Sequence, residues 1–313
     1  MLRPLPSKGT IGICAPAGPV NTDRLQVAVR HLISLGYGIK LTDNVGGKQG
    51  FLSAADSIRC SELESLFADE EVDLVWCARG GVGTSRLLPM IDYRILEMSR
   101  KPFAGFSDLT ALQWAMWSER KVVSFSGPLA VEFESGLSEE SRDFALNLLS
   151  GASYKNWLAS FPQVEPQVLR TGAREIIAPM LPGNLTMISS LLGTRWMPDL
   201  RGVILVIEDV SEPPYRVDRL IFHLRNAGVL QNLAALVVGD FGWSGDEAEG
   251  NYELLRQSVL AGTIGTSYPI LTNFPYGHGA VRMTLPVGTP MRLTIQSDTI
   301  GLSYGSSPFE LIA

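Results

Sequence analysis

One serine stands where an apolar segment turns into a helical pattern. Residues 101–110 read Lys-Pro-Phe-Ala-Gly-Phe-Ser-Asp-Leu-Thr, which predicts a strand, a tight turn and a helix that begins near Asp108. Ligand sites of open α/β sheets lie at the carboxyl ends of strands, where the following helix offers free N–H groups. Gly105 matches the first glycine of the G-x-S-x-G nucleophile turn, whereas Leu109 stands at the second. Ser107 is therefore a candidate nucleophile for acyl transfer, and a simple helix N-cap is the alternative.

A glycine-rich loop is predicted to follow an earlier strand. Residues 77–86 read Cys-Ala-Arg-Gly-Gly-Val-Gly-Thr-Ser-Arg. The nucleotide-binding interpretation is weak, because Arg86 stands where a dinucleotide fingerprint has its third glycine and the chain has no Gly-Lys-Ser/Thr. The loop is either a turn that only lets the chain leave the strand or a source of backbone N–H groups beside Ser107. Acyl transfer needs such donors for the developing oxyanion.

A carboxylate and a histidine complete the candidate chemistry. The apolar run 203–207 ends in Glu208 and Asp209, and because side chains alternate along a strand, only one of the two can orient a given histidine. His278 lies between glycines in Phe-Pro-Tyr-Gly-His-Gly, where the backbone can bring an imidazole into a crowded site. A serine, a carboxylate and a loop histidine, each at the end of an element, are the set that acyl-transfer chemistry requires.

The remaining histidines and the cysteines indicate no other chemistry. His31 and His223 lie within helical patterns and are predicted to be surface or packing residues. The three cysteines, Cys14, Cys60 and Cys77, are far apart with no CxxC, so we expect buried free thiols and no disulfide framework. With so few of these ligands, we predict no metal site and no cofactor.

Composition excludes several classes of partner. The 313 residues are 45% hydrophobic and 19% charged, with a net charge of −6 and no dense Lys/Arg block. Nucleic acid and an anionic membrane surface are therefore not expected, and a small peptide substrate fits better. No stretch of about 18 apolar residues occurs, and residues 1–9 lack the apolar run of a signal peptide. We expect a cytoplasmic protein.

The fold class that this pattern predicts is α/β. In the first half, predicted strands at 10–16, 37–42, 72–78, 101–104 and 122–125 alternate with predicted helices at 23–35, 54–67 and 108–118. This alternation predicts a mostly parallel sheet with helices on both faces.

A domain boundary is predicted where this alternation fades, between about residues 149 and 167, which divides the chain into domains 1–165 and 166–313. In the second half, β-rich runs lie at 176–178, 202–207, 234–238, 282–286 and 291–295, with helices at 184–192 and 216–227. This pattern predicts an α/β domain with a mixed or barrel-like sheet.

Short motifs follow one another along nearly the whole chain. They are Ala-Pro-Ala-Gly at 15–18, Ala-Arg-Gly-Gly-Val-Gly at 78–83, Gly-Phe-Ser-Asp-Leu-Thr at 105–110, Pro-Gly-Asn-Leu at 182–185, Glu-Asp-Val-Ser-Glu-Pro-Pro-Tyr-Arg-Val-Asp-Arg at 208–219, Gly-His at 277–278 and Leu-Pro-Val-Gly at 285–288. In this order they resemble the LD-carboxypeptidase family of serine peptidases, which also contains the microcin-immunity hydrolases.

The resemblance implies a Rossmann-like N-terminal domain that carries the nucleophile, Ser107. The C-terminal domain would carry Glu208, which orients the imidazole, and His278, the general base. Enzymes of this family hydrolyse the amide between an L-centre and a terminal D-residue, typically releasing D-alanine from murein tetrapeptide during cell-wall recycling. They need no metal and are commonly homodimers.

The resemblance also assigns the oxyanion hole to the backbone N–H groups of Gly80, Gly81 and Asp108. Two positions depart from the family pattern: Ser126 replaces the histidine of a frequent His-Gly-Pro, and Pro182 replaces the first glycine of a frequent Gly-Gly-Asn-Leu. Both concern the substrate pocket and leave the triad untouched.

Two other functions compete with the murein carboxypeptidase hypothesis. An immunity-type hydrolase of aminoacyl-nucleotide antibiotics would want an aromatic platform near the site, for which Trp196 and Trp243 are loop candidates. A non-catalytic ligand-binding protein belongs to a different class and would not need the three triad residue types.

Overall fold

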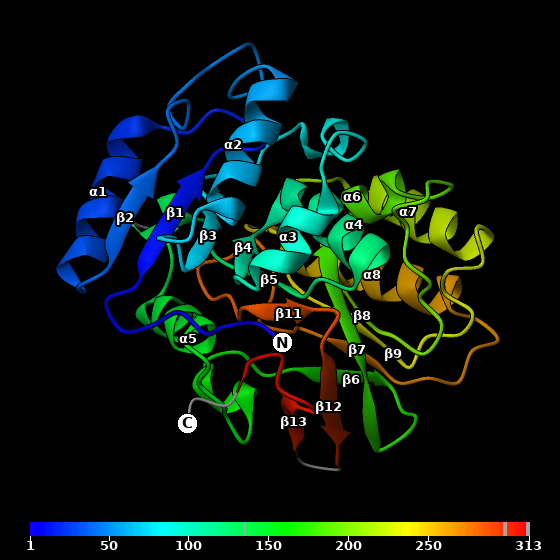
Figure 1. Cartoon of the computed structure of the whole chain (residues 1–313). Helices are drawn as coiled ribbons and strands as arrows, with labels where there is room; N and C mark the ends of the chain where they lie inside the picture. The colour runs from blue at the N-terminus through cyan, green and yellow to red at the C-terminus, as the bar shows by residue number, and fades with distance from the viewer. Residues whose placement is uncertain (134–135, 297–298, 311–313) are drawn as a thin grey trace.

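Two β-sheets share the chain, as Figure 1 shows. The computed structural model describes residues 1–133, 136–296 and 299–310. The first sheet has six strands and the second has seven. The expected fold class, α/β with a mostly parallel first sheet and a mixed second sheet, is confirmed.

The first sheet has the order β11-β5-β4-β3-β1-β2. Its strands are β1 (Thr10–Cys14), β2 (Gly38–Leu41), β3 (Leu74–Cys77), β4 (Phe103–Gly105), β5 (Ser124–Ser126) and β11 (Leu285–Val287). Strands β1 to β5 pair in parallel, and β11 runs antiparallel to β5. Every residue of β3, β4 and β5 is buried, which is typical of a parallel sheet covered on both faces.

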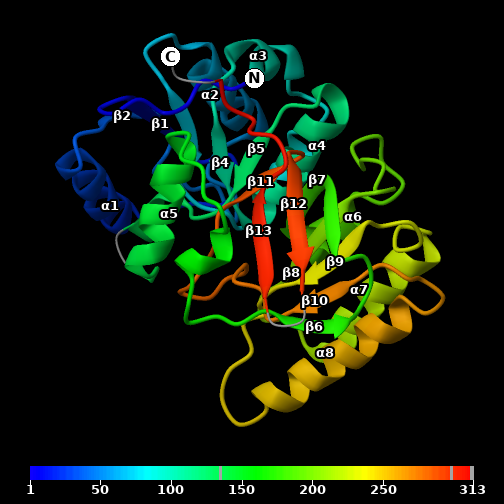
Figure 2. The same ribbon diagram turned by 90° about the horizontal axis from the view of Figure 1, so that it is seen from below.

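Helices cover both faces of this sheet. They are α1 (Thr22–Ser34), α2 (Asp56–Ala68), α3 (Tyr93–Ser99), α4 (Thr110–Arg120) and α5 (Glu139–Leu149). Seen from below, α2, α3 and α4 lie on one side of the strands, with α1 and α5 on the other (Figure 2). The sequence explains α1 in detail: the Asn21 side chain caps its N-terminus, Leu25 and Leu32 supply its buried stripe, and Gly36 follows with φ +97°.

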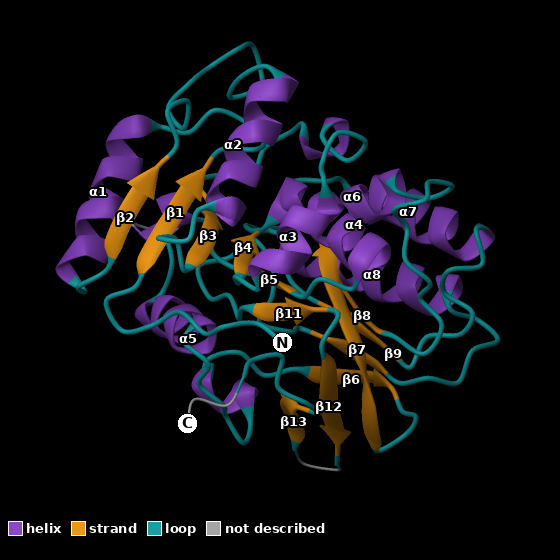
Figure 3. Cartoon of the chain, viewed as in Figure 1, coloured by secondary structure: helices purple, strands orange, loops and turns teal. Residues whose placement is uncertain are grey.

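The second sheet has the order β13-β12-β7-β8-β9-β10-β6. Its strands are β6 (Gln167–Arg170), β7 (Glu175–Asn184), β8 (Ile204–Glu208), β9 (Ala235–Val238), β10 (Ile270–Thr272), β12 (Pro290–Ile295) and β13 (Ile300–Tyr304). Strands β7 to β10 are parallel, while β6, β12 and β13 pair antiparallel. Its helices α6 (Leu185–Ser190), α7 (Pro214–Asn226) and α8 (Ala248–Gly262) gather on one side (Figure 3).

Strand β11 links the two halves of the chain. After β10 the chain leaves the second sheet, and residues 285–287 then become the edge strand of the first sheet. The observed strand, 285–287, is thus shorter and begins later than the predicted strand 282–286, because residues 282–284 still belong to the preceding loop. The loop between β10 and β11 therefore passes from one sheet to the other. The proposed division at residue 165 stays a prediction.

Candidate active site

Ser107 follows β4 directly and sits in a strained turn. It opens a short 3₁₀ helix, Ser107–Leu109, that continues into α4. Its φ is +64°, a left-handed conformation that non-glycine residues adopt mainly where the surroundings enforce it, often at functional sites. Gly105 makes the turn possible, since a Cβ there would lie 2.9 Å from the Cβ and Cγ of Leu109. The side chain of Ser107 is half-buried, at the carboxyl end of the sheet.

The glycine loop after β3 lies against this turn. A Cβ on Gly80 would come within 3.0 Å of the Ser107 Cβ and 3.3 Å of its Oγ, so any side chain there would crowd the serine. Gly81 has φ +110° and packs on the backbone of Gly18, whose N–H donates to the Gly80 carbonyl at 3.1 Å. The structure therefore brings Gly80, Gly81 and Ser107 together at the ends of β1, β3 and β4.

The Asp108 carboxylate ties the glycine loop to the serine turn. It is buried and accepts hydrogen bonds from the Thr84 N–H and hydroxyl, each at 2.9 Å. The same hydroxyl also donates to the Asp108 carbonyl. Burial raises the pKa of Asp108, while its bonds to Thr84 oppose the rise. Sequence reasoning missed Thr84, whose only signal was its place directly after the glycine run.

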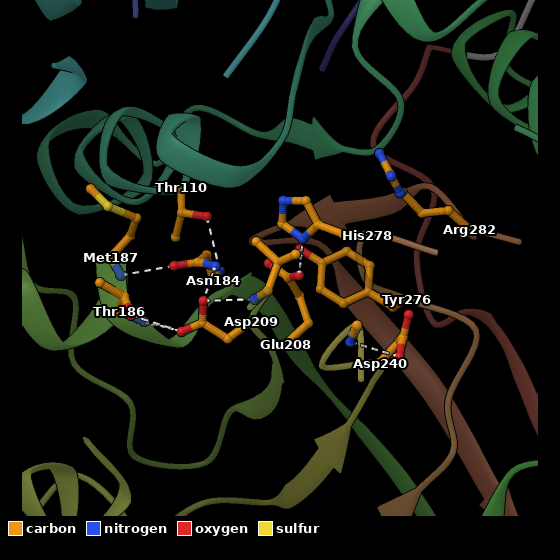
Figure 4. A network of polar contacts seen from close by, with 12 residues as sticks. Thr110, Asn184, Thr186, Met187, Glu208, Asp209, Asp240, Tyr276, His278 and Arg282 are labelled. Carbon is orange, nitrogen blue, oxygen red and sulfur yellow. Dashed lines mark hydrogen bonds and ion pairs between the residues drawn. The ribbon is translucent and has the colours of Figure 1, made fainter. Parts of the chain in front are cut away.

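Glu208 and His278 are in direct contact. Glu208 is the last residue of β8 and its side chain is fully buried; its Oε2 lies 2.6 Å from Nδ1 of His278, which is 21% exposed. Figure 4 shows the imidazole above the carboxylate. Burial raises the pKa of Glu208, and the hydrogen bond with His278 opposes that rise. The second oxygen, Oε1, has no partner among the described residues, so the imidazole supplies the main stabilisation of this carboxylate.

Asp209 points to the other side, as strand alternation requires. Its carboxylate accepts from the Asn184 side chain at 2.9 Å and from the Thr186 N–H and hydroxyl at 3.0 and 2.8 Å. It also accepts from the N–H of Val210 at 2.9 Å. Asn184 caps α6. Asp209 therefore fixes the start of α6, away from the imidazole (Figure 4).

The loop that carries His278 is held by its own backbone and by the β9–α8 connection. The Met283 N–H donates to the Pro275 carbonyl at 2.7 Å, and the Asp240 N–H donates to the Tyr276 carbonyl at 2.8 Å. Gly277 has φ +151°, and a Cβ there would lie 2.7 Å from Asp240. The glycine before His278 is thus required by this close approach.

Tyr276 connects the histidine loop to the first sheet. Its hydroxyl and that of Ser126 lie 2.7 Å apart, and both side chains are buried. Ser126 stands where the family pattern often has histidine, and here it satisfies a buried phenol. Burial and the nearby Glu208 raise the Tyr276 pKa well above its ordinary value.

Arg282 joins the two halves of the site, and sequence reasoning missed it. Its guanidinium is 1% exposed and pairs with Glu132 through two bonds of 2.7 and 3.1 Å. It also lies over the Phe106 ring, 4.1 Å from the centroid. The same ring packs against the His278 imidazole at 4.7 Å between centroids. Because Phe106 directly precedes Ser107, Arg282 supports both the serine turn and the histidine.

The structure brings the expected site residues together in two groups, Gly80 and Gly81 with Ser107, and Glu208 with His278. Phe106 is the described contact between the serine turn and His278. Within the described residues the Ser107 hydroxyl has no hydrogen-bond partner, so its proton transfer with His278 stays a prediction. Of the other histidines, His223 contacts the Ser189 hydroxyl at 2.7 Å from within α7.

The described residues lack the features of two other kinds of site. They contain no group of three or more His, Cys, Asp or Glu side chains arranged to hold a metal ion. None of their helices combines the length and apolar character needed to cross a membrane.

A cavity of about 610 Å³ lies beside the histidine loop, at the carboxyl ends of β9 and β10. Its lining includes Asp240, Tyr252, Asn273 and residues 279–281. Ser107 is not among its lining residues.

Comparison with known families identifies the class of protein. Residues 11–127 match the LD-carboxypeptidase N-terminal domain and residues 178–293 match the LD-carboxypeptidase C-terminal domain. The chain belongs to the LD-carboxypeptidase family of peptidases.

Individual relatives extend this assignment over nearly the whole chain. A probable murein peptide carboxypeptidase from Bacillus subtilis is 30% identical over 307 residues, which cover 95% of this chain and 92% of the relative. The murein tetrapeptide carboxypeptidase of Pseudomonas aeruginosa is 29% identical, with 90% and 92% covered.

Solved structures share the fold. The crystal structure of muramoyltetrapeptide carboxypeptidase from Oxalobacter formigenes is similar with a TM-score of 0.83 and 31% identity, covering 96% of this chain and 99% of that one. The microcin C7 self-immunity protein in complex with aspartyl sulfamoyl adenosine has a TM-score of 0.86 at 24% identity, with 99% of each chain covered, and shows a likeness of fold alone.

Proposed function

We propose that this protein is a serine carboxypeptidase that hydrolyses the amide between an L-centre and the terminal D-alanine of murein tetrapeptide. The observation that carries the proposal is the buried Glu208–His278 contact of 2.6 Å beside the strained serine turn. A carboxylate bound to one imidazole nitrogen fixes the tautomer and leaves the other nitrogen free to act as a base. The names of the relatives supply the murein substrate.

Ser107 is the nucleophile in this mechanism. Its hydroxyl attacks the scissile carbonyl while Nε2 of His278 accepts the proton, and Glu208 stabilises the imidazolium that results. The backbone N–H groups of Gly80, Gly81 and Asp108 would receive the oxyanion, and the bonds between Thr84 and Asp108 hold that loop in place.

The imidazolium then protonates the nitrogen of the leaving D-alanine, and the C–N bond breaks. The acyl group remains on Ser107 as an ester. Water attacks this ester with His278 again acting as the base, which releases the tripeptide and restores the serine.

The test is release of D-alanine from purified murein tetrapeptide by the wild-type protein. Ser107→Ala and His278→Ala should each abolish turnover, and the double variant should be little worse than either, because the two residues act as one unit. His223→Ala is a matched control, since this imidazole lies on α7 and contacts Ser189. Full activity of Ser107→Ala would refute the proposal.

A second substrate in the same assay covers the alternative class. Aspartyl sulfamoyl adenosine, bound by the microcin C7 self-immunity protein, should be cleaved poorly if the murein proposal holds. The two tryptophans that could stack on the nucleobase of such a substrate have other contacts: Trp243 stacks on Phe241, and Trp196 lies under Arg195. Efficient cleavage of the nucleotide and none of the tetrapeptide would reverse the assignment.

We further propose a homodimer in the cytoplasm, as the family resemblance implies. The three cysteines are free and buried, which suits a reducing compartment. Light scattering on a size-exclusion column tests the dimer, and fractionation of the source cells tests the compartment.

A further inference from the structure

The glycine loop beside the nucleophile carries an arginine, Arg79, that has no acidic partner among the described residues. Arg79 follows β3 and immediately precedes Gly80, whose Cβ position lies 3.3 Å from the Ser107 Oγ. Consecutive Cα atoms are about 3.8 Å apart, so the Arg79 backbone begins one residue from the contact with the serine. Its side chain is exposed, and Nη1 donates to the Pro19 carbonyl at 2.7 Å.

Three other arginines of this region each contact a carboxylate. Arg59 and Arg86 share the carboxylate of Asp56, and Arg282 pairs with Glu132. Among the described residues, Arg79 has no carboxylate within ion-pair distance. Since a guanidinium carries five N–H donors and Pro19 uses one of them, the fork remains available for a second, planar acceptor.

The place of Arg79 in the sheet is where ligands of this kind of fold bind. The chain moves from β1 outward to β2 and then returns to β3 on the other side of β1, so the strand order reverses between β1 and β3. Open α/β sheets bind ligands in the crevice at such a point. Arg79 belongs to the loop after β3 and contacts Pro19 in the loop after β1, so it spans this crevice.

The backbone that carries Arg79 is fixed from two sides. The Ala78 N–H donates to the Cys14 carbonyl at 2.8 Å, and the Ala78 carbonyl accepts from Val131 at 3.2 Å. The next residue, Gly80, accepts from Gly18 at 3.1 Å. The backbone from which the Arg79 side chain extends is therefore fixed one residue from the contact with Ser107, while the side chain itself is exposed.

We propose that Arg79 binds the free α-carboxylate of the terminal D-residue and so makes the enzyme a carboxypeptidase. The inference rests on the proposed function and adds the group that recognises the end of the substrate. Bidentate binding of a carboxylate suits the planar guanidinium. Only about three bonds separate the scissile carbonyl from that carboxylate, so the group that binds it must come from a loop that adjoins the serine, as the loop of Arg79 does.

The experiment compares two peptides that differ only at the end, one with D-alanine and one with D-alaninamide. Wild-type protein should prefer the free acid. Arg79→Gln should lose about 10- to 100-fold in kcat/KM on the acid, the range expected for a charge-assisted hydrogen bond, and little on the amide. Arg79→Lys should recover part of the preference, because it restores the charge without the fork.

Arg86→Gln is the matched control, since it removes an exposed guanidinium of the same loop region that already has a carboxylate partner. The ratio of its kcat/KM on the free acid to its kcat/KM on the amide should equal that of the wild type. An unchanged ratio in Arg79→Gln, with D-alanine still released, would overturn the inference and leave the proposed function standing. Failure of the wild type to cleave either peptide would overturn both.

Discussion

The pair of Arg282 and Glu132 should be worth more to the fold than any surface ion pair. In Arg282→Met, the Glu132 carboxylate loses two hydrogen bonds, and among the described residues it keeps that from the Leu129 N–H at 2.7 Å. Breaking a buried pair from one side costs about 3–5 kcal/mol. Since the Glu132 side chain is 23% exposed, we expect the loss of the ion pair to lower the free energy of unfolding by about 3 kcal/mol, the low end of this range. The lost contact with the Phe106 ring adds about 1 kcal/mol.

Removal of the Glu132 carboxylate should lower the free energy of unfolding by at least as much as removal of the Arg282 guanidinium. Glu132→Gln leaves a guanidinium that is 1% exposed without its counter-charge, so we again expect about 3–5 kcal/mol. The double variant should be less destabilised than the sum of the two, with a coupling energy of about 2–3 kcal/mol.

Urea denaturation of the wild type, both single variants and the double variant measures this coupling. Arg201→Met provides the control, because Arg201 pairs with Asp199 at a side-chain exposure of 77%, and it should shift the free energy of unfolding by less than about 0.5 kcal/mol. A coupling energy below about 0.5 kcal/mol for Arg282 and Glu132 would refute the reasoning.

Three further predictions follow from the site. Glu208→Gln should lower kcat by about 10⁴-fold, because an amide cannot stabilise the imidazolium. Asp209→Asn should leave most of kcat intact and lower the stability of α6 by about 1–3 kcal/mol. Steady-state kinetics that rank the two variants the other way would reassign the orienting carboxylate. Burial raises the Glu208 pKa, so the folded chain binds this proton more tightly than the unfolded chain, and stability should fall as pH rises from about 4.3 through the raised folded pKa. Across that range the melting temperature of Glu208→Gln should rise relative to that of the wild type. A difference in melting temperature that stays constant with pH would contradict the assignment. Hydrolysis should survive exhaustive chelation, and activity lost in EDTA and restored by zinc would exclude the serine mechanism.

Local patterns predicted the elements that carry the serine. The apolar segment before Gly105 and the helical pattern after Ser107 correspond to β4, the 3₁₀ turn and α4. The glycine loop at 80–83 likewise follows a strand whose residues are all buried. These features depend on neighbours in sequence, so spacing and turn chemistry were sufficient.

Features that depend on distant partners could not be predicted from periodicity. Arg282 looked like the first residue of a strand, and its role comes from Glu132, 150 residues earlier in the chain. The pairing of β11 with β5 is equally remote in sequence. Helix α8 was missed because it buries little more than Leu255 and Val259 and has a glycine near its start. The role of Thr84 depends on how the loop folds onto Asp108.

The edge strand β11 has a consequence for the order in which the chain can fold. Ribosomes release the N-terminal end first, so β1 to β5 emerge about 160 residues before Leu285–Val287. Until then β5 has an unpaired edge, and the residues Ser124, Phe125 and Ser126 are open to wrong partners. The nascent N-terminal half therefore completes its sheet only after strands β6 to β10 of the second sheet have been synthesised. Chaperone binding during translation should concentrate in this interval, and a fragment that stops before β11 should aggregate through the free edge.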